Sequence, residues 1–84
     1  MNRRLDIFVK IVKNMTQIKT FVLNGKSYYF KESINLLNLL SYFNYNESIL
    51  VLEHNNAICP KQKWNNVFIK DQDKIEIVTI VGGG

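Results

Sequence analysis

The chain contains only one cysteine, one histidine and one proline, and these shortages exclude several classes of protein. A lone Cys59 cannot form an internal disulfide, and one cysteine with one histidine cannot supply a four-ligand zinc site. The longest apolar runs are far below the roughly 20 residues that span a bilayer. With 46% hydrophobic residues and few glycines, the 84 residues are typical of one small folded domain. We therefore expect a soluble intracellular protein.

The usual catalytic motifs are also missing. We find no Walker loop, no GxGxxG sequence and no paired metal ligands at a recognisable spacing. His54 and Cys59 are on or beside successive predicted strands but have no supporting motif. We interpret Cys59 as a small buried residue, with a persulfide-bearing role as the minor alternative, and His54 as a surface residue at a strand end. The pattern therefore predicts no bound metal or cofactor.

The net charge of +4 is unevenly distributed. Residues 1–14 hold four basic residues and one acid (Arg3, Arg4, Lys10, Lys13 and Asp6), whereas residues 15–84 hold seven lysines and six acids. Three of the four net charges therefore belong to a basic N-terminal extension, residues 1–14. Its apolar residues fit a helical stripe or an alternating strand, so it is either a basic amphipathic helix for a membrane or partner, or a loosely docked extension.

The remaining sequence predicts a β-hairpin followed by one helix. Alternation from Ile18 to Leu23 leads into Asn24-Gly25, the residue pair that a type I′ turn favours, and Tyr28 and Phe30 continue beyond it. Leucines then recur at helical spacing over residues 34–43, with Ser33 as the expected N-cap.

Three further strands are expected after this helix. Residues 48–53 and 57–59 flank an Asn55-Asn56 turn, Pro60 ends the second of these strands, and residues 74–81 form the last. A β-β-α-β-β-β order predicts an α+β domain in which a helix packs on one face of a mixed sheet. Trp64 is expected to hold its loop against the core. On the last strand, Ile75 and Ile77 should face the core, which places Val78 and Ile80 on the opposite face.

The C-terminus ends in Gly82-Gly83-Gly84 directly after the last predicted strand. Glycine loses the most backbone entropy on ordering, so three terminal glycines predict a flexible and thin tail, residues 82–84, beyond a domain of residues 15–81. Extended, such a tail reaches roughly 10 Å and can enter a channel that a Cβ would obstruct. The α-carboxylate of Gly84 is ionised at neutral pH and could be activated by attack on the α-phosphate of ATP. Nothing in the sequence could bind ATP, so another protein must activate it.

These features resemble the ThiS/MoaD family of sulfur carriers, which have a ubiquitin-like β-grasp fold. The matching segments run from residue 17 to residue 84: Leu23 to Lys26, Ser33 to Leu40, Ile49 to Trp64, Asp71 to Val78, and Val81 to Gly84. Gln72 departs from the pattern because it replaces the glycine usual in the Asp-Gly-Asp turn, and residues 1–14 have no counterpart. The Pro60 to Trp64 segment favours the thiamine branch of the family over the molybdopterin branch.

The resemblance implies a protein cosubstrate for thiazole synthesis and not an enzyme. A ThiF-type enzyme would adenylate Gly84 with Mg-ATP, a cysteine-derived persulfide would supply sulfur, and the thiazole synthase ThiG would accept it from the thiocarboxylate. Gly82 and Gly83 would give the tail its reach. Val78, Ile80 and Val81 are the expected partner-binding residues, and the free protein is expected to be a monomer.

Three alternative functions remain open. They are a MoaD-like carrier for molybdopterin synthase, a ubiquitin-like modifier that forms isopeptide bonds through Gly84, and a basic RNA-binding module that stacks bases on its tyrosines. The abundance of asparagine, isoleucine and lysine is typical of an A/T-rich genome, so the expected location is the cytoplasm, or the plastid stroma if the gene is in an organelle.

Overall fold

The computed structural model describes residues 4, 6–8, 11 and 18–80. Within them, two strands, β1 (Lys19–Leu23) and β2 (Lys26–Phe30), precede the helix α2 (Leu36–Tyr42). The strands β3 (Leu50–His54), β4 (Ala57–Ile58) and β5 (Asp73–Thr79) follow it, together with two 3-10 helices, η1 (Glu47–Ile49) and η2 (Lys61–Lys63). This order confirms the predicted succession of strands around one main helix.

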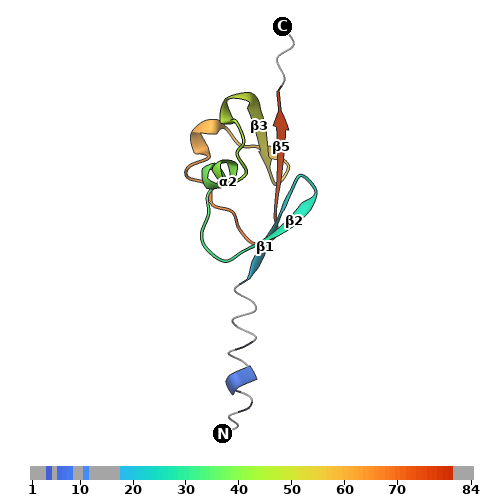
Figure 1. Ribbon diagram of the computed structural model, residues 1–84, viewed down its shortest axis with the longest axis vertical. Coiled ribbons are helices and arrows are strands. Elements are labelled where there is room, and N and C mark those ends of the chain that lie inside the picture. The colour runs from blue at the N-terminus through green and yellow to red at the C-terminus, as the bar shows by residue number, and fades with distance from the viewer. Residues whose placement is uncertain (1–3, 5, 9–10, 12–17, 81–84) are drawn as a thin grey trace.

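The five strands form one mixed sheet in the order β2-β1-β5-β3-β4. The neighbouring strands β1 and β5 run parallel to each other, and the other neighbours are antiparallel. Figure 1 shows α2 and both 3-10 helices on the same side of the sheet. No helix of the described residues lies against the other side, which is the open face of the sheet. The predicted α+β architecture with a helix on one face is therefore confirmed.

The first hairpin closes as the sequence predicts. Leu23 pairs with Lys26, and the two turn residues between them, Asn24 and Gly25, have φ angles of 49° and 83°. Both angles lie in the left-handed region that a type I′ turn requires. The Asn55-Asn56 turn also has positive φ angles at both residues. At Gln72, where the family pattern has glycine, φ is 71°, so the turn keeps a left-handed residue without glycine.

The helix begins two residues later than predicted. Ser33 is not its N-cap: the side chain of Asn35 accepts a hydrogen bond from the amide of Asn38, and the Asn38 side chain accepts one from the amide of Asn35. This reciprocal capping satisfies amides that would otherwise lack partners in the first turn. The Asn35-x-x-Asn38 box lies inside the apolar pattern, whereas Ser33 stands directly before it, so the pattern alone favours Ser33 as the cap.

Two strand boundaries also differ from the sequence prediction. Residues 48 and 49 belong to η1, because the Asn46 side chain accepts a hydrogen bond from the amide of Ser48 and caps a 3-10 turn. The strand itself then runs to His54. The last strand begins at Asp73 and ends at Thr79, although the amide of Ile80 still donates to the carbonyl of Ile49.

The hydrophobic core lies between α2 and the covered face of the sheet. Its fully buried side chains are Leu36, Leu40, Leu52 and Ile75. Trp64 is also buried, and its indole Nε1 donates to the carbonyl of Cys59 at 2.9 Å, which confirms that it holds the loop against the core. Ile75 and Ile77 face this core as predicted. Because side chains alternate along β5, Val78 points to the opposite face of the sheet.

The described residues of the N-terminal extension, at positions 4, 6–8 and 11, have helical backbone. The side chains of Ile7, Phe8 and Ile11 are exposed. For these residues the structure favours the helical alternative over the strand. The proposed division at residue 14 and the predicted glycine tail, residues 82–84, lie outside the described residues.

Candidate functional site

The predicted carrier chemistry is at the end of the chain that follows β5. Figure 1 shows β5 ending at the pole of the domain opposite to the start of β1. The described chain stops at Ile80, so the predicted partner-binding residue Val81, the predicted tail residues Gly82 and Gly83, and the predicted reactive residue Gly84 lie outside the described residues. The structure describes the surface around the end of β5, which precedes these residues in the chain.

An apolar patch on the open face of the sheet leads to this end of β5. The side chains of Val78 and Ile80 are 61% and 54% exposed, so both point away from the core as predicted. Val51 on β3 lies directly opposite Val78. Ile58 on the edge strand β4 is 67% exposed, and its pairing with Glu53 places it on the same face. We call Val51, Ile58, Val78 and Ile80 the open-face patch.

Two members of this patch, Val51 and Ile58, are not among the partner-binding residues predicted from the sequence. The sequence predicts both only as parts of strands, although alternation on β3 indicates the direction of Val51. Leu50 and Leu52 are buried, so Val51 between them must face the open side. Contiguous exposed apolar side chains commonly mark an interaction surface.

Two carboxylates border the open-face patch. Glu53 on β3 is directly opposite Glu76 on β5, and Lys74 Nζ is 3.3 Å from Glu76 Oε1. Like charges in directly opposed positions of a sheet destabilise it. Among the described residues, Glu53 has no ion-pair partner, so the patch presents one carboxylate that a basic residue of a partner could pair with.

At the opposite end of β5, Asp73 is buried in a hydrogen-bond network. Its Oδ2 is 2.7 Å from His54 Nε2 and accepts from the amide of Lys70, while its Oδ1 accepts from the Asn55 side chain. Burial raises the pKa of Asp73, but the hydrogen bonds from Asn55, His54 and Lys70 outweigh it, so the net pKa lies below its ordinary value.

This network corrects the interpretation of His54. Its side chain is at the end of a strand, as expected, but it is partly buried against Asp73 and is not simply a surface residue. The pair joins the β3–β4 turn to the beginning of β5. It is far along β5 from Ile80, so it acts on the framework of the sheet and not on the tail.

Cys59 is half-buried next to Trp64. Burial raises the pKa of the Cys59 thiol, and the positive charge of Lys63 only partly offsets this effect. A raised pKa keeps the thiol protonated at neutral pH, which makes it a poor nucleophile. Within the described ranges, no group of three histidine, cysteine or acidic residues could hold a metal ion, and no helix is long and apolar enough to cross a membrane.

Several known proteins are similar to this chain. The chain is 58% identical over 73 residues to the protein named uncharacterized protein ycf40 of Trieres chinensis, covering 83% of this chain and 100% of that one. It is 36% identical over 63 residues to the sulfur carrier protein ThiS of Bacillus subtilis, covering 74% of this chain and 96% of the relative.

A third relative is much longer. The chain is 35% identical over 63 residues to a thiazole synthase of Paramagnetospirillum magneticum, and the match covers 75% of this chain but only 19% of that protein. A segment similar to this chain is therefore one part of that thiazole synthase.

The fold is likewise found in a solved structure. The crystal structure of the thiamine biosynthesis protein ThiS of Geobacter metallireducens superimposes with a TM-score of 0.67 at 26% identity, covering 77% of this chain and 99% of the other. This likeness confirms the β-grasp fold. The model of the ThiS family matches residues 16–84, a range that includes all three terminal glycines. The chain therefore belongs to the ThiS family of sulfur carriers.

Proposed function

We propose that this protein carries sulfur for thiazole synthesis as a thiocarboxylate on Gly84. The observation that supports this most strongly is the family match, which continues to the last residue of the chain. In this proposal the protein is a cosubstrate, and the chemistry is performed by its partners. Gly82 and Gly83 serve as a tail without side chains that enters the active sites of those partners.

The activation step consumes one ATP. A Gly84 carboxylate oxygen attacks the α-phosphate of Mg-ATP in a ThiF-type enzyme, the bond to pyrophosphate breaks, and an acyl-adenylate forms. The terminal sulfur of a cysteine-derived persulfide then attacks the carbonyl carbon and displaces AMP, which gives an acyl disulfide. A second thiol attacks this disulfide, releases the thiocarboxylate and is itself oxidised to a disulfide.

The open-face patch is the part of the folded domain that we assign to partner docking. Val78 and Ile80 are exposed, apolar and directly before the tail, so a partner that receives Gly84 must approach them. Glu53 beside the patch adds a charge that suits a basic residue on the partner. Val81 continues from this strand into the tail and remains part of the predicted contact.

Thiazole synthase of the ThiG type is the proposed sulfur acceptor. Support comes from the thiazole synthase that contains a segment similar to this chain, because joining two activities in one chain favours functions that meet in one reaction. A plastid location is also part of the proposal. It rests on the composition typical of an A/T-rich genome and on the shared name ycf40 of relatives such as that of Porphyra purpurea.

Intact mass distinguishes this function from its alternatives. The full chain is incubated with ATP, the cognate adenylating enzyme and a persulfide donor, and a gain of about 16 Da, the exchange of one oxygen for sulfur, is expected. Covalent attachment to lysines of other proteins would instead indicate a ubiquitin-like modifier. Sulfur transfer to a molybdopterin precursor and not to thiazole synthase would indicate the MoaD-like alternative.

A further inference from the structure

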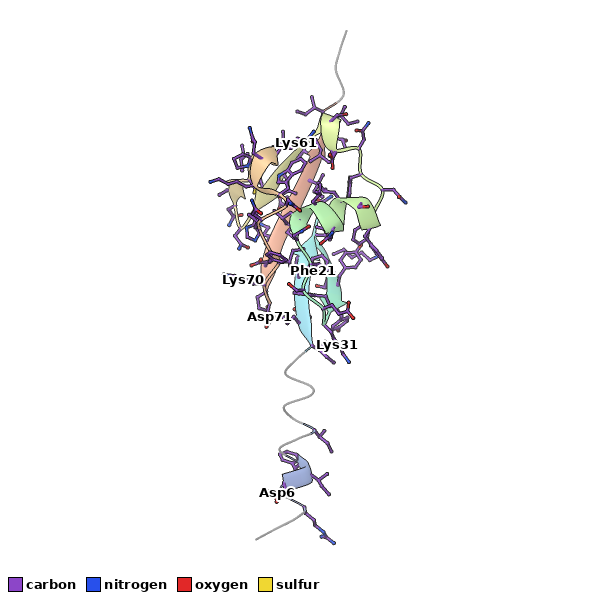
Figure 2. All side chains as sticks on the ribbon, turned by 90° about the vertical axis from the view of Figure 1, so that its left-hand side faces the viewer. Asp6, Phe21, Lys31, Lys61, Lys70 and Asp71 are labelled. Atoms are coloured by element: carbon purple, nitrogen blue, oxygen red, sulfur yellow. The ribbon has the colours of Figure 1, made fainter. Side chains whose placement is uncertain are left out.

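A second surface, on the covered side of the sheet, is not used by the carrier function. A groove of about 330 Å³ lies between α2 and the β1–β2 hairpin. It is lined mainly by aromatic side chains, among them Tyr28, Phe30, Tyr42 and Phe43. Figure 2 shows Phe21 between β1 and α2, at the inner end of this region. The open-face patch is on the other side of the sheet, so the two surfaces are separate.

The rings of the groove form a continuous packed row. The ring centroids of Phe21 and Tyr28 are 5.5 Å apart, those of Tyr28 and Phe43 are 5.1 Å apart, and those of Phe43 and Tyr42 are 5.0 Å apart. Tyr42 at the outer end is 80% exposed. Because these rings already pack against one another, their side chains would lose little conformational entropy when a ligand binds to the apolar surface that they form.

The positive charges at this groove are placed over its rings. Lys26 Nζ is 5.7 Å from the ring centroid of Tyr28, and Lys19 Nζ is 5.1 Å from that of Phe30. Lys19 pairs with Phe30 across the hairpin, so the two lysines stand at opposite ends of β2, about 13 Å apart along the strand. An extended ligand with an apolar centre and an acidic residue near each end would complement this arrangement.

The groove also lies beside a free strand edge. β2 is the first strand in the sheet order, and within the part of the chain that the structure describes it pairs with β1 alone. The carbonyl of Thr20 on β1 accepts from the amide of Gln72, and the amide of Asn24, the turn residue directly after β1, donates to the carbonyl of Ile75, so these backbone groups point toward β5. The intervening residues of β1 therefore bond to Lys26, Tyr28 and Phe30, and the backbone groups of Ser27 and Tyr29 point outward.

From the free edge, the aromatic groove and the two lysines, we propose that β2 binds an extended acidic peptide of a partner protein as an added strand. The peptide backbone pairs with Ser27 and Tyr29, an aliphatic side chain enters the groove, and carboxylates two residues to either side pair with Lys26 and Lys19. This site is independent of the tail, so the carrier could hold such a partner while Gly84 is being loaded.

The test uses a synthetic peptide, acetyl-Glu-Thr-Leu-Thr-Glu-amide, and the full-length protein labelled for NMR. We expect concentration-dependent shifts at the amides of Ser27 and Tyr29 and at the ring of Tyr42. A matched peptide with lysine in place of both glutamates should cause none. Lys26→Glu should weaken binding roughly fivefold, whereas Lys61→Glu on η2 should not.

Several outcomes would overturn the proposal. They are no shifts at millimolar peptide, equal shifts with the lysine peptide, shifts confined to the open face, and binding of an oligouridine RNA at these residues without binding of the peptide. Formation of a β2-to-β2 dimer that excludes the peptide would also overturn it. Lys26→Glu should still gain about 16 Da in the loading reaction, so failure of this proposal is distinguishable from failure of the carrier function.

Discussion

His54 Nε2 lies 2.7 Å from Asp73 Oδ2, and this contact joins the end of β3 to the first residue of β5. Asn55 strengthens the same junction, because its side chain donates to Asp73 and accepts from the amide of Lys74. β5 is the central strand that carries the tail. The network therefore fixes the beginning of the strand that precedes Gly84 in the chain, the residue to which we assign the sulfur in the proposed function.

Replacing Asp73 with asparagine should destabilise the domain by about 1–3 kcal/mol, because buried donors lose their charged acceptor. The measurement is urea unfolding at pH 7. Glu32→Gln, a change at an exposed carboxylate, is the matched control and should leave the free energy of unfolding nearly unchanged. Equal stability of Asp73→Asn and the parent would contradict the structural role of this network.

The stability of the protein should also depend on pH through Asp73. Its pKa in the folded state is lowered, so its stabilisation is fully present above the unfolded-state pKa of about 3.9 and is lost as pH falls through the lower folded value. Unfolding curves between neutral pH and strong acid should show this loss, and Asp73→Asn should reduce it. A parent and variant with the same acid profile would show that other carboxylates cause the acid sensitivity.

At Gly25 the cost of substitution should come from backbone conformation alone. An added Cβ would meet nothing within 4 Å, but φ is 83°. Gly25→Ala should therefore cost about 1–2 kcal/mol, and Gly25→Asn less, because asparagine tolerates the left-handed region. Thermal unfolding of the two variants gives the order, and a more stable alanine variant would contradict the turn assignment.

Trp64 should contribute through both packing and its indole hydrogen bond to Cys59. Trp64→Phe keeps most of the apolar surface but leaves a carbonyl without its partner, at a cost of about 1–3 kcal/mol. Trp64→Ala should cost about 3–5 kcal/mol because it also leaves a cavity. Urea unfolding of both variants separates these contributions. Equal decreases in the free energy of unfolding would show that packing of the aromatic ring contributes nothing.

A charge introduced into the open-face patch should cause a selective loss of partner binding. Ile80→Glu should abolish complex formation with the adenylating enzyme while the fold stays intact, because a charge is introduced where an apolar contact forms. Tyr42→Glu, which places the same charge at an even more exposed side chain on the covered side of the sheet, is the control and should bind normally. Isothermal titration with circular dichroism checks both points, and unchanged binding of Ile80→Glu would reject the patch.

Local patterns were sufficient to predict the succession of strands and helix along the chain, the hairpin turn and the directions of Ile75, Ile77, Val78 and Ile80, but not the order of the strands within the sheet. These features depend on alternation and on φ angles that only a few residue types favour. The helix start was missed because two asparagines cap each other across one turn, and the His54–Asp73 contact was missed because it joins residues 19 positions apart. Val51 and Ile58 join the patch only through strand register, which short-range patterns do not specify.

Locating the added sulfur tests the central claim most directly. After loading with ATP, the adenylating enzyme and a persulfide donor, tandem mass spectrometry of the full chain should place a gain of about 16 Da on Gly84, and a chain lacking Gly84 should gain nothing and transfer no sulfur to thiazole synthase. A gain of about 32 Da on Cys59, as in a persulfide, with sulfur transfer that survives deletion of Gly84, would contradict the account.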